Sequence, residues 1–449
     1  MRYIYLCTLA AALGGFLFGY DTAVVNGSIE YLVQDFDLSA GLEGWAASSA
    51  LIGCIFGAMF AGMIGDRFGR KRAMLLCAAL FTVSAVGSAI PQTLSFFVWA
   101  RFIGGLGVGG ASMLSPMYIA EISPEKIRGR LVSIYQLAIA AGILIAFLIN
   151  MLIQRMGDQA WNTDMGWRWM FGSEIIPAIM FGVVLLVVPE SPRWLMKIGR
   201  RSEAMAILAG IAGQAHAELE VAHISESLKH EEGKFSELFT SGFRMALIVG
   251  VFMAIFQQLC GIQVVMYYST KIMKSVGSST DAAFMSTVVM GVVMVVFTFV
   301  AIWLVDKVGR RILLIAGTTI QCVSLTIVGL LLHFGGDPYV VLLFLLIFVA
   351  SFAAGMGPVM WIVVSEIFPT KVRGRAMSVT TLTLWAVCYA MTQTFPVLLE
   401  EMGGAGTFAI YAAGSLLSIL FIAKFVPETK GRTLEEIEES WLKRAISKG

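Results

Sequence analysis

Charged residues are scarce in this sequence. Asp, Glu, Lys and Arg make up 14% of its 449 residues, against about 25% in soluble domains. Hydrophobic residues make up 58%, and the mean hydropathy is +0.81. This composition excludes a soluble globular protein. At roughly 20 apolar residues per span, the hydrophobic runs predict an all-α membrane protein with twelve transmembrane helices.

Histidine and cysteine are also scarce, with four and six residues respectively. The six cysteines fall inside the predicted spans and the histidines outside them, and neither set has the spacing of a metal site or a disulfide framework. Together with the absence of a nucleophile–base pattern, this argues against an enzyme. We expect no metal and no cofactor, and the net charge of +2 gives no indication of a nucleic-acid partner.

The positive charges gather on one side of the predicted membrane. If the N-terminus lies in the cytoplasm, cytoplasmic loops and helix ends carry 26 of the 32 Lys and Arg residues. By the positive-inside rule, both termini are then cytoplasmic. The short tails favour a bacterial inner membrane, and the oligomeric state stays open.

Three motifs occur twice at nearly constant offset. Gly65-Asp66-Arg67 returns as Val305-Asp306-Lys307, Glu121-Ile-Ser-Pro124 returns as Glu366-Ile-Phe-Pro369, and Pro189-Glu190-Ser191 returns as Pro427-Glu428-Thr429. Parallel repeats of this kind place a substrate site near the bilayer midplane where two halves meet. The repeats predict the following parts: six-helix halves over 1–188 and 243–426, a cytoplasmic linker over 189–242, and a cytoplasmic tail over 427–449. The linker is interpreted equally well as short amphipathic helices or as a plain connection.

Three ionisable residues stand within predicted spans of the first half: Asp21, Arg101 and Glu174. A charge near the bilayer centre costs roughly 2.5–3.5 kcal/mol on insertion scales, so such residues usually face a cavity or a partner. The three predicted spans have their outer ends near residues 24, 95 and 167, so all three side chains lie at similar depth. Asp21 is roughly 5–8 Å from the outer end of its span. A nearby arginine favours the ionised form of an acid, so a changing contact would change proton affinity. The alternative is a static, charge-compensated pair.

Polar groups suited to a sugar also occur within the spans. Amides offer donors and acceptors for hydroxyl groups, and tryptophan offers an apolar face with one donor. The candidates are Gln136, Gln257, Gln258, Gln263, Trp361 and Trp385. A lone glutamine serves equally well to join two helices, but three within seven residues are harder to explain in that way.

The paired loop motifs resemble those of the sugar porter family of the major facilitator superfamily. So do Pro189-Glu190-Ser191-Pro192-Arg193 and the segment Gln257-Gln258-Leu-Cys-Gly261-Ile-Gln263. The resemblance covers essentially the whole chain and is strongest to the family's bacterial proton-coupled xylose symporters. It implies the major facilitator fold and transport by alternating access.

The resemblance also implies residue roles. Asp21 would accept the proton, Arg101 would modulate its affinity, and Glu174 would be an auxiliary acid. Gln136, Gln257, Gln258 and Trp361 match sugar-contacting positions, Phe18 and Trp385 match apolar lining, and Tyr267 matches the outer gate. The cytoplasmic gating set is Arg70, Glu121, Arg128, Arg310, Glu366 and Arg373, expected to pair across the two halves. Gln263, Met294 and Cys388 depart from the family's asparagines, which leaves the choice between pentose and hexose open.

The leading hypothesis is a proton-coupled monosaccharide symporter, with the sugar bound between the halves. A passive sugar facilitator is the first alternative, and Asp21 speaks against it because facilitative glucose transporters carry asparagine at the matching position. A non-transporting sugar sensor is less favoured, since sensors of this family carry long cytoplasmic tails. An exporter of drugs or organic ions is disfavoured by the amide-rich site.

Overall fold

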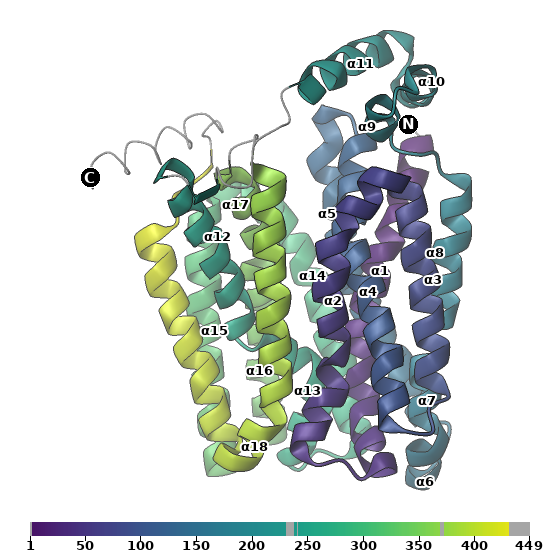
Figure 1. Ribbon diagram of the computed structural model, residues 1–449. Helices are drawn as coiled ribbons and strands as arrows, with labels where there is room; N and C mark the ends of the chain where they lie inside the picture. Colours follow the sequence, from purple (N-terminus) through teal and green to yellow (C-terminus); the bar gives the residue numbers. More distant parts are fainter. Residues whose placement is uncertain (1, 230–237, 240, 369–371, 431–449) are drawn as a thin grey trace. The chain divides into compact units, whose positions relative to one another are not determined.

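The computed structural model describes residues 2–229, 238–239, 241–368 and 372–430, and all regular secondary structure in these ranges is helical (Figure 1). The elements before the linker are α1 (Arg2–Phe36), α2 (Ala40–Phe68), α3 (Arg70–Ala89), α4 (Leu94–Ile122), α5 (Glu125–Gln154), α6 (Gln159–Trp161), a π-helix (Asn162–Gly166), α7 (Trp167–Gly172) and α8 (Ile175–Val187). The remaining elements are α9 (Pro192–Lys197), α10 (Arg201–Ala212), α11 (Gln214–Lys229), α12 (Ser241–Leu259), α13 (Ile262–Ser275), α14 (Thr280–Val308), α15 (Arg310–Phe334), α16 (Pro338–Ala354), α17 (Met356–Ile367) and α18 (Arg373–Phe425).

Eleven helical segments of the described chain are long and apolar enough to cross a membrane. The last of them, α18, contains two helices, because Gly403 has φ 67° and ψ 177° in its interior. This conformation is open to glycine and costly for other residues. The two helices of α18 complete the expected set of twelve, and the all-α fold predicted from the sequence is confirmed.

Several helices run past the limits that hydropathy predicts. The largest difference is in α1, which was expected to end near residue 24 and ends at Phe36. Its last turns carry Asn26, Glu30 and Gln34, whose polarity ends the hydrophobic run. Each of these side chains has a hydrogen-bond partner, so the helix keeps its polar residues without leaving them unpaired.

The chain divides into two compact units. Unit 1 comprises Met1–Thr22, Ser49–Ala146 and Trp167–Glu232, and unit 2 comprises Ala23–Ser48, Phe147–Gly166 and Gly233–Gly449. The C-terminal part of α1, the N-terminal part of α2 and the end of α5 thus belong to unit 2. The halves predicted at 1–188 and 243–426 describe the sequence repeat and stay a prediction.

Within unit 1, α2 and α4 approach closely through glycines. A Cβ atom at Gly105 of α4 would collide with the carbonyl oxygen of Ala50 on α2, and one at Gly53 would meet the carbonyl oxygen of Phe102. Small residues allow such contact between helices in a membrane, where burial of apolar surface does not drive association. This contact helps to fix α4, which carries Arg101.

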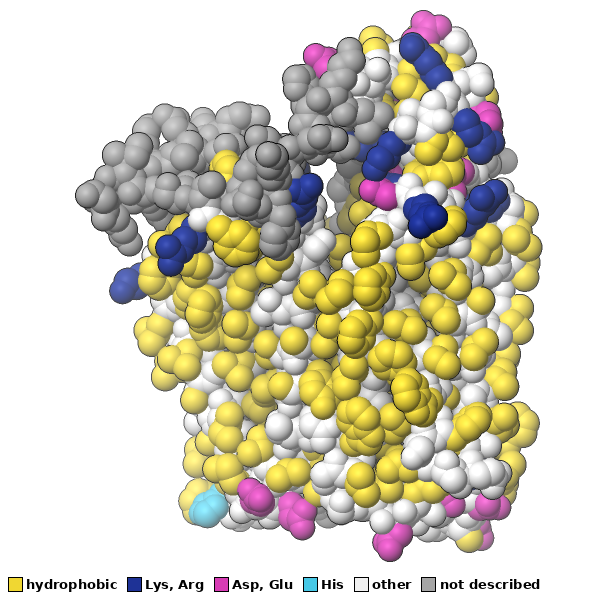
Figure 2. Space-filling model, viewed as in Figure 1, with side chains coloured by type: hydrophobic (Ala, Val, Ile, Leu, Met, Phe, Trp, Pro, Cys, Tyr) yellow, Lys and Arg dark blue, Asp and Glu magenta, His cyan; other side chains and the backbone are white. Residues whose placement is uncertain are grey.

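The segment predicted as a linker contains α9, α10 and α11. Figure 1 shows these helices beyond one end of α3, α4 and α8, within unit 1. Leu208 of α10 packs with Ala217, Val221 and Ile224 of α11 in a small apolar core. On the face seen in Figure 2, Lys and Arg side chains gather near the end that bears these helices, while the wall below is largely apolar. This distribution agrees with a cytoplasmic end and a lipid-facing wall.

Candidate functional site

The centre of unit 1 contains a buried ion pair between Asp21 of α1 and Arg101 of α4. Nη1 of Arg101 lies 2.5 Å from Oδ1 of Asp21, and Nη2 lies 3.0 Å from Oδ2. Asp21 is 3% exposed and Arg101 is 1% exposed. A guanidinium that binds a carboxylate through both nitrogens fixes its orientation as well as its charge. The structure therefore joins two residues that lie 80 positions apart in the sequence.

The arginine packs against an aromatic cluster. The guanidinium carbon of Arg101 lies 5.2 Å from the centre of the Phe171 ring on α7. Phe171 in turn packs edge-on against Phe97 of α4, with ring centres 5.2 Å apart. The ring face attracts the cation, and the aromatic cluster keeps water away from the ion pair. The exclusion of water strengthens the attraction between Arg101 and Asp21, and the ring contact adds to the stability of the buried cation.

Glu174 lies at a break in the sixth span, between α7 and α8. Pro177 causes the break locally, because its nitrogen carries no proton for the carbonyl of Ser173. Tyr20 of α1 and Ser173 share a hydrogen bond of 2.7 Å, which ties α1 to this turn. Glu174 is 1% exposed and interacts electrostatically with Asp21 and Arg101. Both of its carboxyl oxygens are buried.

The position of Asp21 along α1 differs from the predicted one. Asp21 was expected a few residues from the outer end of its span, but α1 continues to Phe36, about 22 Å of helix further on. Asp21 is therefore a mid-helix residue. The expected proximity of Asp21 and Arg101 is observed, and their roles in proton transfer stay a prediction.

The three glutamines of the second half lie at the break between α12 and α13. Gly261 adopts the left-handed conformation there, with φ 80°, and ends α12 just after Gln257 and Gln258. Gln257 is 3% exposed, and its Nε2 donates to the carbonyls of Met356 and Gly357, at 2.9 and 3.1 Å. Oε1 of Gln258 and Nε2 of Gln263 are buried without a partner among the described residues. These amide ends are available to a ligand.

The remaining predicted sugar positions are distributed over both units. Phe18 of α1 and Gln136 of α5 are half-buried in unit 1. Trp361 of α17 is half-buried and Trp385 of α18 is 3% exposed, both in unit 2. Tyr267 of α13 is buried in unit 2, with its ring centre 6.5 Å from that of Tyr268.

Two family positions with altered chemistry are also buried in unit 2. Met294 of α14 is 8% exposed, and Cys388 of α18 is 1% exposed. Neither side chain offers the donor and acceptor pair of an asparagine. Both replacements thus lower the polarity of the interior of unit 2.

Two predicted gating residues of unit 1, Arg70 and Glu121, belong to one polar network beside the start of α9. Arg70 contacts Asp66 at 2.8 Å and Glu121 at 2.9 Å, and Ser191 donates a hydrogen bond to Glu121. Glu190 accepts hydrogen bonds from the backbone of Lys71 and Ser191. The side chain of Arg128 lies outside the described part of the chain.

Unit 2 repeats the two ion pairs of this network. Arg310 contacts Asp306 at 3.0 Å and Glu366 at 3.2 Å, and Arg373 donates to the carbonyl of Phe368. Each of these ion pairs lies within one unit, so the expected pairing across the halves stays a prediction.

Glu428 occupies the place in unit 2 that Glu190 has in unit 1. Its carboxylate accepts backbone N–H groups at the start of α15 and in the segment after α18, from Arg310, Arg311, Thr429 and Lys430. Partial burial acts to raise the pKa of this carboxyl, but the N–H donors outweigh it and hold the pKa below its usual range.

Unit 2 also contains a polar contact that the sequence did not indicate. Asn26 of α1 donates to the carbonyl of Met266 and to Ser269 of α13, at 2.8 and 2.5 Å. Its oxygen accepts from the backbone N–H and the hydroxyl of Thr270. Both protons of this amide and both acceptor positions of its oxygen are thereby directed at α13, which fixes the end of α1 against that helix.

Two lysines of α13 extend this contact. Nζ of Lys271 lies 2.6 Å from Oε2 of Glu43 on α2, and Nζ of Lys274 lies 2.9 Å from Oε2 of Glu30 on α1. Glu43 is only 4% exposed. The spacings Asn26–Glu30 and Lys271–Lys274, four and three residues, place each pair on one helix face. That regularity is the signal from which the contact could have been found.

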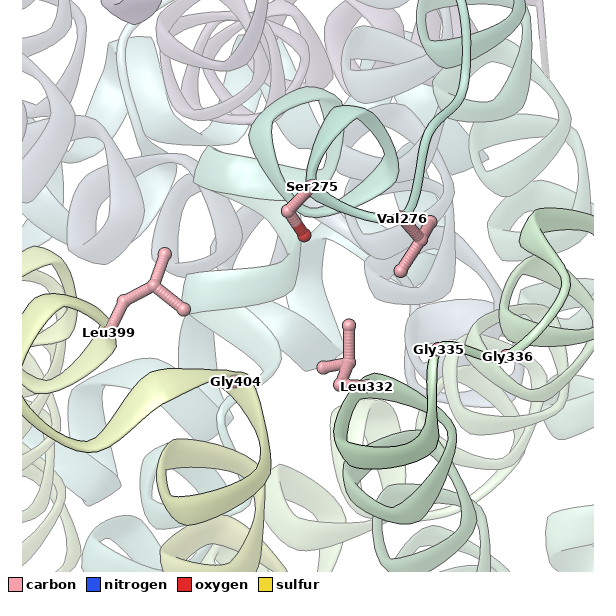
Figure 3. A pocket seen from close by; sticks show the side chains of 7 residues that line it. All are labelled: Ser275, Val276, Leu332, Gly335, Gly336, Leu399 and Gly404. Atoms are coloured by element: carbon pink, nitrogen blue, oxygen red, sulfur yellow. The ribbon is translucent and has the colours of Figure 1, made fainter.

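A cavity of about 350 Å³ opens elsewhere in unit 2 (Figure 3). The ends of α13 and α15 and the region before and after the Gly403 kink line it, through Ser275, Val276, Leu332, Gly335, Gly336, Leu399 and Gly404. Ser275 carries the one polar side chain of this set, and its hydroxyl already donates to the carbonyl of Ile272. The lining offers a sugar few hydrogen bonds, so we do not place the substrate there.

Comparison with known proteins supports the assignment of the chain to a family. Residues 7–441 match the family model described as "Sugar (and other) transporter". The arabinose-proton symporter of Bacillus subtilis is 42% identical over 99% of this chain and 96% of its own length. The D-xylose-proton symporter of Escherichia coli is 43% identical over 98% and 96%. The structure of the E. coli xylose transporter in a partially occluded inward open conformation matches with a TM-score of 0.88 and 41% identity, over 96% of this chain and 100% of that one.

The helical architecture, its repeat and the buried polar sites define a multi-pass membrane transporter with the major facilitator fold. The chain belongs to the sugar porter family of this superfamily. It is accordingly a transporter and not an enzyme.

Proposed function

We propose that this protein is a proton-coupled monosaccharide symporter that works by alternating access. The observation that carries the proposal is the buried trio of Asp21, Arg101 and Glu174. Two similar proteins are named as proton symporters of arabinose and of xylose. A passive facilitator has no need for two acids and one base buried at the same place.

The charge balance of the trio explains how it could take up a proton. Arg101 supplies one positive charge, whereas Asp21 and Glu174 supply two negative charges if both are ionised. An uncompensated charge in a buried site costs several kcal/mol. One proton on either acid balances the site, so the trio is suited to carry one proton with each turnover.

Arg101 and the proton compete for Asp21. A proton on this carboxyl removes one half of the ion pair and releases the guanidinium, with which Glu174 also interacts electrostatically. A change of Arg101 between these two acids would alter the proton affinity of Asp21 during the transport cycle. This exchange is the role that we assign to Glu174.

The sugar is proposed to bind through amides and indoles. Gln257, Gln258 and Gln263 offer hydrogen-bonding groups at the α12–α13 break, and Gln136 offers another amide on α5. Trp361 and Trp385 would cover the apolar face of the sugar ring, with Phe18 as further apolar lining and Tyr267 in the outer gate. Met294 and Cys388 stand where the family pattern has asparagines, so they make the site less polar. This change favours a sugar that has few hydroxyl groups near these two side chains.

We propose a bacterial inner membrane as the location, with both termini in the cytoplasm, on the strength of the charge distribution and of the bacterial relatives.

The function is tested by uptake into proteoliposomes with a panel of D-xylose, L-arabinose, D-glucose and D-galactose. We expect at least one of them to accumulate when an inward proton gradient is applied. Equal uptake with and without the gradient would favour the passive facilitator, and no uptake of any sugar would favour a sensor.

A further inference from the structure

The side chain of Gln257 links two transmembrane spans that are each broken in the middle. Gln257 itself lies in the last turn of α12, just before the break at Gly261. Its side-chain nitrogen donates to Met356 and Gly357, which open α17 directly after the break at Gly355. The side chain therefore connects two helix breaks that are about 100 residues apart in sequence.

The orientation of this amide is determined by its partners. Backbone carbonyls accept hydrogen bonds and cannot donate them, so the group that faces Met356 and Gly357 must be the NH2. Two carbonyls at 2.9 and 3.1 Å occupy both of its protons. What Gln257 has left for a ligand is its carbonyl oxygen, which can only accept.

The α16–α17 break is a place where such a connection is needed. Gly355 has φ −123° and ψ −95°, outside the helical region, and Pro358 lacks the N–H that would continue the helix. The carbonyls of Met356 and Gly357 stand in the first turn of α17, and each can accept a second hydrogen bond besides the one within the helix. The NH2 group of Gln257 supplies these bonds and ties the first turn of α17 to the end of α12, and Trp361 lies one turn further along α17.

From these contacts we infer that Gln257 is a positioning residue as well as a sugar ligand. Its NH2 group holds the start of α17, and with it Trp361, against the end of α12. Its carbonyl oxygen accepts from one sugar hydroxyl, which must act as a donor. The inference rests on the proposed sugar transport and specifies the chemistry of one contact within it.

The inference distinguishes two kinds of sugar analogue. A deoxy sugar lacks the hydroxyl, whereas a fluoro sugar keeps a weak acceptor but has no proton to donate. At the hydroxyl that faces Gln257, both analogues should therefore bind equally poorly. If the amide were turned around and donated to the sugar, the fluoro analogue would retain affinity that the deoxy analogue loses.

The experiment measures equilibrium binding of monodeoxy and monofluoro analogues of D-xylose and D-glucose, to the wild type and to Gln257→Met. Methionine keeps the size of the side chain and removes its hydrogen bonds. The hydroxyl coupled to Gln257 is the one whose removal costs about tenfold in the wild type and nothing in the variant. We expect the fluoro analogue at that position to lose the same tenfold. Retained affinity of the fluoro analogue, or the absence of any coupled hydroxyl, would overturn the inference.

A second variant covers the case in which Gln257→Met does not fold. Gln257→Glu keeps an acceptor for the sugar and removes both donors to α17, so it should bind more weakly overall while keeping the wild-type loss for both analogues. Disappearance of that loss would contradict an acceptor role. In hydrogen exchange, Gln257→Glu should deprotect residues 356–367, and the matched variant Gln258→Glu should leave them protected.

Failure of this inference is separable from failure of the proposed function. Binding of the analogues is measured at equilibrium and needs no proton gradient. A protein that shows the expected analogue pattern but takes up sugar independently of the gradient would retain the role of Gln257 and lose the claim of symport.

Discussion

Arg101 holds Asp21 through both terminal nitrogens of its guanidinium group, at 2.5 and 3.0 Å, and neither residue is more than 3% exposed. Such a pair is stable only while both members are present, because removal of one leaves the other charged and desolvated. Removal of either residue should therefore lower the stability of the protein, and the loss should depend on which partners remain for the other residue.

Arg101→Leu leaves two buried acids without a base. We expect a loss of about 3–5 kcal/mol of stability and no transport. Asp21→Asn leaves the arginine with Glu174 and with an amide oxygen as partners, so its loss should stay near 1–3 kcal/mol. Chemical or thermal unfolding of the purified variants in one detergent measures the difference. Equal losses in the two variants would contradict this account of the trio.

The contact between α13 and the ends of α1 and α2 should stabilise unit 2 measurably. A double-mutant cycle of Glu43→Gln and Lys271→Met is expected to give a coupling of about 1 kcal/mol or more, because Glu43 is buried. The matched control is Arg155 and Asp281, which lie 4.0 Å apart with side chains 46% and 65% exposed. Their coupling should stay below about 0.5 kcal/mol. Similar values for the two pairs would show that the buried contact adds nothing.

The close approach of α2 and α4 depends on Gly105. Gly105→Leu should prevent folding or lower the unfolding temperature strongly, because the added side chain meets the backbone of Ala50. Gly62→Leu on α2 is the control, since nothing lies within 4 Å of a Cβ atom there. That change should be neutral or stabilise by up to about 1 kcal/mol through helix propensity. Folded yield and thermal unfolding distinguish the two positions.

Glu428 gives the protein a pH-dependent contribution to stability. Because the folded pKa lies below the usual value, this contribution is complete above the unfolded pKa of about 4.3 and is lost as the pH falls through the folded pKa. Glu428→Gln should therefore cost about 0.5–1 kcal/mol at pH 7, a value reduced for solvent screening, and progressively less below about pH 4. Exposed Glu401→Gln should show no such dependence. A cost that stays constant from pH 7 to pH 3 would contradict the assignment.

The sequence was sufficient for the fold because hydropathy, charge distribution and the repeated motifs all agree on it. It failed at the end of α1, where Asn26, Glu30 and Gln34 interrupt the apolar run although each has a partner in the folded protein. A hydropathy scale counts the free-energy cost of placing a polar side chain in the membrane, but it contains no information about the hydrogen-bond partner that offsets this cost. For the same reason the contacts of Asn26 with α13 were missed.

The candidate site was predicted in part. The cost of a charge in the membrane singled out Asp21, Arg101 and Glu174, and the structure brings Asp21 and Arg101 into contact. Sequence could not show that the amide nitrogen of Gln257 is already bound to α17, since this depends on the path of a helix about 100 residues away.

Proton-driven accumulation by Asp21→Asn, compared with the wild type, tests the central claim most directly. Proteoliposomes are assayed for sugar accumulation under an inward proton gradient and for exchange of labelled sugar without a gradient. Asp37→Asn serves as the control, because Asp37 is exposed after the end of α1 and asparagine tolerates its positive φ of 49°. We predict that Asp21→Asn exchanges sugar but no longer accumulates it, while Asp37→Asn does both. Accumulation by Asp21→Asn at the wild-type level would contradict the account.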